Sequence, residues 1–91
     1  MSTVPVTELT SRAREIFRLV VEGYLASGQA VGSKAIAASG GINLSAASIR
    51  SVLHELELLG LLAHPHTSAG RLPTEAGLRL FVDGIMQVAE P

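Results

Sequence analysis

The feature that most constrains the fold is a helical segment, residues 45–60, with one apolar face and one small, polar face. Its apolar side chains recur three or four residues apart, the spacing that aligns them along one side of a helix; they are Ile49, Val52, Leu53, Leu56 and Leu59. Ser45 stands where an N-cap is expected, and Gly60 stands where a helix ends. Because the apolar face must pack on something, the neighbouring segments decide the fold.

Two more helices are expected before this segment. Apolar residues at helical spacing predict a first helix near 11–27, and a small apolar face predicts a short second helix over 34–39. The residues expected to cap or end them are Thr10 or Ser11 and Gly28 for the first helix, and Ser33 and Gly40-Gly41 for the second. The second helix is therefore joined to the segment 45–60 by a tight turn.

The chain after Gly60 predicts a hairpin and a last helix. Residues 61–64 are expected as a strand, 65–70 as a loop and 71–73 as a returning strand, with Pro73 tolerated at a strand end. Thr74 is expected to cap a fourth helix whose apolar residues are Leu78, Phe81, Val82, Ile85 and Val88.

This order of elements predicts a winged helix-turn-helix: a mainly α fold with a three-helix core, a two-stranded β-hairpin wing and a C-terminal helix. In that geometry the helix 45–59 is left free to enter a major groove, and the loop 65–72 becomes the wing beside it. Ninety-one residues fit a single domain, 1–91, with an ordered core expected over about 8–88.

The charge of the chain does not by itself favour nucleic acid. Net charge is −1 and the isoelectric point is about 6.3, whereas DNA-binding domains are often basic. Residues 1–29 carry three cations and three acids, residues 30–74 three cations and two acids, and residues 75–91 one cation and three acids. The middle part is thus the least acidic, which permits DNA binding.

Composition argues against several other classes of protein. The apolar stretches are too short to span a membrane, the N-terminus lacks the features of a secretion signal, and the absence of cysteine suits the cytoplasm. The three histidines, His54, His64 and His66, lie at no recognisable ligand spacing with a carboxylate. We expect a cytoplasmic domain that is not an enzyme and holds no metal or cofactor.

Several strings of the chain resemble the amino-terminal domain of the heat-inducible transcription repressor HrcA. They are residues 31–34, 43–50, 56–57, 59–62 and 82–83, and most specifically 65–74, so that the resemblance covers roughly 7–86. It implies a repressor that binds an inverted-repeat operator upstream of chaperone genes, helped by the GroEL chaperonin. It also implies a homodimer in the full-length form, through a dimerising part that these 91 residues do not include.

The residues expected to bind DNA lie on the two inner helices and the wing. Arg50 and Arg71 are expected to anchor phosphates, while Ala47, Ser51 and His54 are the candidates for base contact. The full set is Ser33, Lys34, Asn43, Ser45, Ala47, Ser48, Arg50, Ser51, His54, His66, Thr67, Ser68, Gly70 and Arg71. Three of these residues also have a purely structural explanation. Ser45 would cap a helix, Gly70 would allow a tight turn, and Arg50 would form a surface ion pair with an acid such as Glu57.

Two further expectations concern how the chain would contact DNA. The resembled family usually has Asn where this chain has Ser51, and Ser cannot make the bidentate contact that Asn makes with adenine. Three well-placed cations, Lys34, Arg50 and Arg71, predict that the logarithm of affinity falls against the logarithm of salt concentration with a slope of roughly −2.7.

The alternative function is a winged helix that contacts protein instead of DNA. The first and fourth helices favour it, because their apolar faces are wide. Four residues are expected to exceed the core and to meet a second copy or a further part of the protein: Phe17, Val21, Leu80 and Met86.

Overall fold

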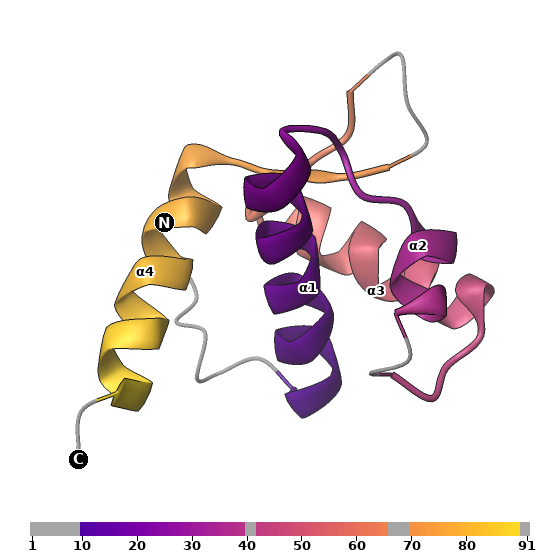
Figure 1. Ribbon diagram of the computed structural model, residues 1–91, viewed down its shortest axis with the longest axis horizontal. Helices are drawn as coiled ribbons and strands as arrows, with labels where there is room; N and C mark the ends of the chain where they lie inside the picture. The colour runs from indigo at the N-terminus through magenta and orange to yellow at the C-terminus, as the bar shows by residue number, and fades with distance from the viewer. Residues whose placement is uncertain (1–9, 40–41, 66–69, 90–91) are drawn as a thin grey trace.

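A computed structural model describes residues 10–39, 42–65 and 70–89 as four helices and one two-stranded hairpin (Figure 1). The elements are α1 (Ser11–Ser27), α2 (Ser33–Ala38), α3 (Ala46–Leu58), β1 (Leu62–Ala63), β2 (Leu72–Pro73) and α4 (Glu75–Ala89). The strands pair antiparallel, with Leu62 opposite Pro73 and Ala63 opposite Leu72. Element order and type are as the sequence predicts.

Local residues set most helix ends. Thr10 caps α1 by accepting a hydrogen bond from the backbone N–H of Ala13 at 3.1 Å, and Gly28 ends that helix with φ of 74°. Ser45 caps α3, and Gly60 follows its end with φ of 82°. Each of these ends agrees with the sequence prediction, because an N-cap needs a side-chain acceptor and a left-handed residue favours glycine.

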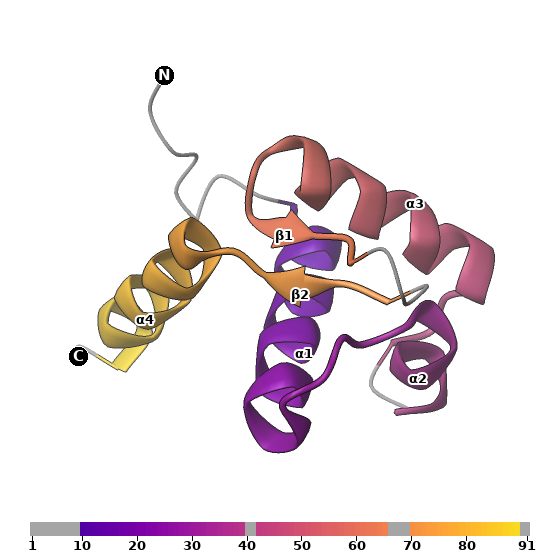
Figure 2. The same cartoon turned by 90° about the horizontal axis from the view of Figure 1, so that it is seen from above.

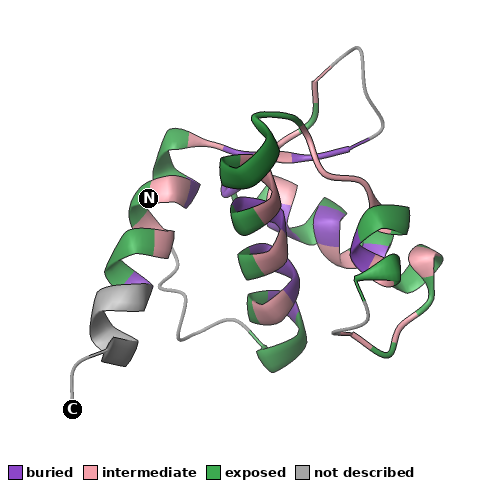
Figure 3. Ribbon diagram, viewed as in Figure 1, coloured by how far each residue is buried: buried purple, intermediate pink, exposed green. Residues whose placement is uncertain are grey.

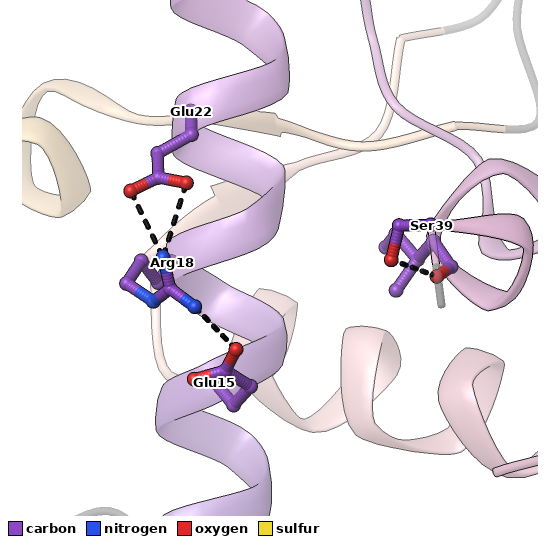
Figure 4. Close-up of polar contacts among 5 residues, drawn as sticks. Glu15, Arg18, Glu22 and Ser39 are labelled. Atoms are coloured by element: carbon purple, nitrogen blue, oxygen red, sulfur yellow. Dashed lines mark hydrogen bonds and ion pairs between the residues drawn. The ribbon is translucent and has the colours of Figure 1, made fainter. Parts of the chain in front are cut away.

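The predicted cap of α2 is wrong. Ser33 is the first helical residue, Gly32 occupies the cap position with extended backbone, and no side chain caps the helix. At the other end, the hydroxyl of Ser39 donates to the carbonyl of Ile36 at 2.6 Å (Figure 4). The predicted stop at Gly40-Gly41 lies outside the described residues.

The core lies where α1, α2, α3 and the hairpin meet (Figure 3). Viewed from above, the hairpin crosses α1, with α3 alongside β1 (Figure 2). The buried apolar residues are Ala13, Ile16, Phe17, Val20, Val21, Ile36, Ile49, Leu53, Leu56, Leu61 and Leu62. Each large aliphatic or aromatic side chain removed from water stabilises the fold by about 1.5–3 kcal/mol.

The core is wider on α1 than the sequence predicts. Phe17 and Val21, expected to exceed it, are 1% and 0% exposed. The reason is tertiary: both residues belong to the core cluster, and the ring of Phe81 on α4 packs edge-on against Phe17, with centroids 6.3 Å apart. Leu80 is half-buried, and the side chain of Met86 lies outside the described part of the structure.

The predicted apolar stripe of α3 is correct except at its end. Ile49, Leu53 and Leu56 are buried and Val52 is half-buried, but Leu59 is 43% exposed. Leu59 is the C-cap, past the last helical residue, so it leaves the buried side of the helix. Val82, expected on the apolar face of α4, is 54% exposed.

The start of α4 is fixed against Gly60 and Leu61, the two residues directly before β1. Thr74 caps α4 by accepting from the N–H of Gly77 at 3.0 Å, and its own hydroxyl donates to the carbonyl of Gly60 at 2.6 Å. The N–H of Thr74 donates to the carbonyl of Leu61 at 3.1 Å. A Cβ on Gly77 would lie 2.1 Å from that same carbonyl oxygen, so the helix can approach this closely only with glycine there.

Candidate nucleic-acid interface

The outward side of α3 carries four exposed residues spaced three or four apart, here called the α3 face: Ala47, Arg50, Ser51 and His54. The sequence predicts this exposure, which the packing of the opposite side of α3 into the core confirms. The hydroxyl of Ser51 lies 3.4 Å from the carbonyl of Ala47, one turn earlier. The face therefore combines small side chains with one long cation.

The first turn of α3 presents hydroxyls. Ser45 and Ser48 are both exposed; the Ser45 hydroxyl accepts from the N–H of Ser48 at 3.2 Å and also donates to the Ser48 hydroxyl at 3.1 Å. The turn is therefore capped, and its polar groups stand beside the α3 face. Backbone N–H groups at the start of a helix favour negative charge nearby.

Two depressions flank α3. The first, of about 450 Å³, lies between α2, α3 and the hairpin and is lined by Gly32, Ser33, Lys34, Arg50, Leu53, His64 and Arg71. The second, of about 530 Å³, is lined by Ala47, Arg50, Ser51, His54, Glu55 and Arg71. The fold thus brings Ser33 and Lys34 of α2 to the same surface as Arg50.

Arg71, which the sequence predicts to anchor phosphate, is buried in the structure. It is 7% exposed, and its Nε lies 2.9 Å from Oε1 of Glu57 on α3. The sequence leaves Glu57 as a possible partner of Arg50, but in the structure Glu57 pairs with Arg71. A buried guanidinium is tolerated where a carboxylate accepts its hydrogen bond, which accounts for the pair.

The remaining predicted residues are dispersed. Asn43 is exposed, but it lines a separate depression of about 320 Å³ with the start of α1, beside Arg12 and Glu15. Gly70 is buried against the backbone of Val31. His66, Thr67 and Ser68 lie outside the described residues.

Two residues of this surface were not predicted from sequence. His64, exposed directly after β1, lines the first depression, and no pattern in the chain marks it. Glu57 could have been found, because it stands three residues after His54 and so continues the α3 face by one turn. Among the described residues, no group of three histidine or acidic side chains is placed to hold a metal ion.

Two cations away from α3, Arg18 and Arg79, are paired with acids of their own helices. Arg18 donates to Glu15 and to Glu22 on the outer side of α1 (Figure 4). The hydrogen bond to Glu15, aided by Glu22, raises the pKa of Arg18 above its ordinary value, against a smaller opposing effect of burial. Arg79 lies 3.4 Å from Glu75, one turn away on α4. These pairs leave Lys34 and Arg50 as the exposed cations that line the two α3 depressions.

A short helix, a turn, a second helix with an outward polar face, and a hairpin beside it together define a winged helix-turn-helix domain. A crystal structure described as that of a hypothetical protein shares this fold, with a TM-score of 0.85 and 34% identity over 94% of this chain and 28% of that one. No protein-family model matches the chain.

Proteins named heat-inducible transcription repressor HrcA match all 91 residues. Identity is 75% in Novosphingobium aromaticivorans, 71% in Erythrobacter litoralis and 66% in Sphingopyxis alaskensis. The chain spans 26% of the length of each of these relatives. It belongs to the HrcA family and corresponds to the amino-terminal part of its members.

Proposed function

We propose that this chain is the DNA-binding domain of a transcription repressor of heat-shock genes. The α3 face carries the proposal: it is exposed, contains small side chains, and has Arg50 standing between two depressions. A major groove about 12 Å wide admits a helix of this kind. The names of the relatives, all heat-inducible transcription repressors, support the biological role.

In this proposal the residues on and beside α2 and α3 have two roles, contact with phosphates and contact with base edges. Arg50, Lys34 and the first-turn hydroxyls of Ser45 and Ser48 contact phosphates, which position the domain but do not read sequence. Ala47, Ser51 and His54 face the base edges. In this proposal Ser33 adds a contact to the DNA backbone beside Lys34, and Asn43 lies at the edge of the interface. His66, Thr67 and Ser68, which lie outside the described residues, are expected near the neighbouring minor groove, and the buried Gly70 packs behind them against Val31.

The form of the DNA site depends on how many copies of the domain bind it. Two domains related by a two-fold axis read an inverted repeat, with half-sites one helical turn or a multiple of it apart. We propose that the rest of a full-length repressor joins them as a homodimer in the cytoplasm, and that GroEL acts on that longer protein. None of the described helices is long and apolar enough to cross a membrane.

The burial of Arg71 changes the expected salt dependence. Two exposed cations, Lys34 and Arg50, face DNA per domain, so the slope is about −1.8 instead of the −2.7 expected from three cations. Fluorescence anisotropy with a labelled inverted-repeat duplex, from about 50 to about 200 mM salt, measures it. Lys34→Ala and Arg50→Ala should each make the slope less steep by about 0.9.

Arg79→Ala is the matched control, because Arg79 lies on α4, pairs with Glu75 and lines neither depression. It should leave the slope unchanged. Binding that is independent of salt, or that survives the Lys34 and Arg50 substitutions together, would contradict the proposed function.

A protein-contact module is the second candidate. Exposed apolar residues favour it, above all Leu58 at 74% and Leu25 at 62% exposed. A folded chain that gave no anisotropy change with any duplex at low salt would support this candidate over DNA binding.

A further inference from the structure

Arg71 joins three parts of the surface described above. Its N–H donates to the carbonyl of Val31 at 2.8 Å, and its own carbonyl accepts from the N–H of Val31 at 2.7 Å. This bridge links the hairpin to the segment that leads into α2. Its side chain reaches in another direction, to Glu57 on the last turns of α3, so a single residue connects the hairpin with both inner helices.

The backbone around this bridge is closely packed. A Cβ on Gly70 would lie 2.8 Å from the carbonyl carbon of Val31 and 2.9 Å from its oxygen. On the other side, a methyl of Val31 lies 2.9 Å from where Gly23 of α1 would carry a Cβ. The segment before α2 is therefore held between α1 and the hairpin, which fixes the hairpin relative to α2.

The hairpin also packs on α3: Leu61 and Leu62 share the core with Leu53 and Leu56, and the N–H of Leu61 donates to the carbonyl of Leu56 at 3.1 Å. The two strands share two residue pairs. The Arg71–Glu57 pair spans the space between β2 and α3, and the Arg71 side chain is 9% exposed. A hydrogen-bonded ion pair is directional, so it restricts the angle between the two elements.

Glu57 also has an electrostatic consequence for DNA. It stands one turn beyond His54 on α3 and its side chain is 33% exposed, so a bare carboxylate there would repel nearby phosphates. Pairing with Arg71 neutralises it. The same contact thus sets a distance and removes an unfavourable charge.

We propose that Arg71 and Glu57 are positioning residues of the DNA-binding surface: the pair holds the hairpin at a set angle to α3, and Arg71 does not itself bind phosphate. This inference rests on the proposed function. It differs from the expectation for an anchoring arginine in a measurable way, because a phosphate contact contributes about 0.9 to the salt slope and a positioning pair contributes nothing.

Glu57→Gln is the decisive variant, because the two roles predict opposite signs. If Arg71 were a phosphate anchor, removing its acidic competitor would tighten binding. If the pair positions the hairpin, Glu57→Gln weakens binding to the inverted-repeat duplex on the order of tenfold, a common coupling for residues in contact. The salt slope stays at its original value.

Two more variants are needed: Arg71→Lys as a second test of the pair, and Glu55→Gln as a control. Lysine keeps the charge that a phosphate needs but loses the planar guanidinium, so Arg71→Lys should match Glu57→Gln in affinity and slope. Glu55, an exposed acid on the same helix, lines the second depression. Glu55→Gln is the control for charge removal, and it should tighten binding.

A loss of stability alone would not reproduce these results. Circular dichroism at the binding temperature measures the folded fraction of each variant, and affinities are expressed per folded molecule. The ratio of affinity for the inverted repeat to affinity for a scrambled duplex should fall in both pair variants, because a misplaced hairpin loses contacts specific to the site. An unchanged ratio would reduce the pair to a stabilising contact and overturn the inference.

A measurement on the unchanged chain covers variants that fail to fold. The Nε–H resonances of its arginines are followed by NMR as unlabelled duplex is added. Arg50 should shift strongly while Arg71 keeps its chemical shift and its slow exchange with water. A shift of Arg71 as large as that of Arg50, or tighter binding by Glu57→Gln, would overturn the inference; a chain that bound no duplex would overturn the proposed function itself.

Discussion

Gly77→Ala should destabilise the fold, whereas helix propensity alone predicts that it stabilises. Gly77 lies in the first turn of α4, and alanine in a helix is favoured over glycine by up to about 1 kcal/mol. The structure opposes this gain. The new methyl would lie 2.1 Å from the carbonyl oxygen of Leu61, whereas ordinary contacts begin near 3.4 Å, so α4 or the hairpin must move by more than 1 Å.

The magnitude follows from the contacts that this movement breaks. Thr74 makes two hydrogen bonds across the junction, N–H to the Leu61 carbonyl at 3.1 Å and hydroxyl to the Gly60 carbonyl at 2.6 Å. At about 0.5–1.5 kcal/mol each, their loss outweighs the gain in propensity. With strain at the fully buried Leu61 added, we expect a net loss of about 2 kcal/mol, which lowers Tm by about 8–16 °C.

Thermal and urea unfolding followed by circular dichroism measures the effect. Ala76→Gly, at the exposed neighbouring position, is the matched control, because it reports propensity without the steric conflict and should cost no more than about 1 kcal/mol. The reasoning is refuted if Gly77→Ala is as stable as the unchanged chain or more stable.

Two further predictions concern α3, each measured by the same unfolding experiments. Leu53 is 1% exposed, so Leu53→Ala should lower the free energy of unfolding by about 2–5 kcal/mol. Leu58→Ala on the same helix, at 74% exposure, should lower it by less than about 1 kcal/mol. Equal losses would contradict the placement of the core. Ser45→Ala removes the cap of α3 and should cost about 1 kcal/mol. Ser51→Ala, within the same helix, should instead raise stability by a few tenths of a kcal/mol, so a shared sign would count against the assigned helix start.

The prediction at the N-terminus of α2 failed for an instructive reason. A hydroxyl at Ser33 satisfies the residue preference for an N-cap, yet the chain turns into the helix one residue earlier, at Gly32. Just before it, Val31 is bonded to Arg71 through both backbone groups. That long-range bridge sets where the extended segment ends, and a local preference worth about 1 kcal/mol does not override it.

The sequence by itself determined the elements, because their causes are local. Helical periodicity placed the buried side of α3 and left the α3 face exposed, and capping residues with glycines set the ends of α1 and α3. The family resemblance rested on the same local strings, and the relatives confirmed it.

The tertiary structure decided which distant residues meet. Arg71 and Glu57 are 14 residues apart, and nothing in their spacing distinguishes Glu57 as the partner of Arg71 rather than of Arg50. Phe17 is buried because Phe81 reaches it from the far end of the chain. Local patterns specify secondary structure through short-range hydrogen bonds and periodicity, whereas burial and ion pairing depend on how the folded elements pack. For that reason only the tertiary structure showed that Arg71 is buried and paired with Glu57.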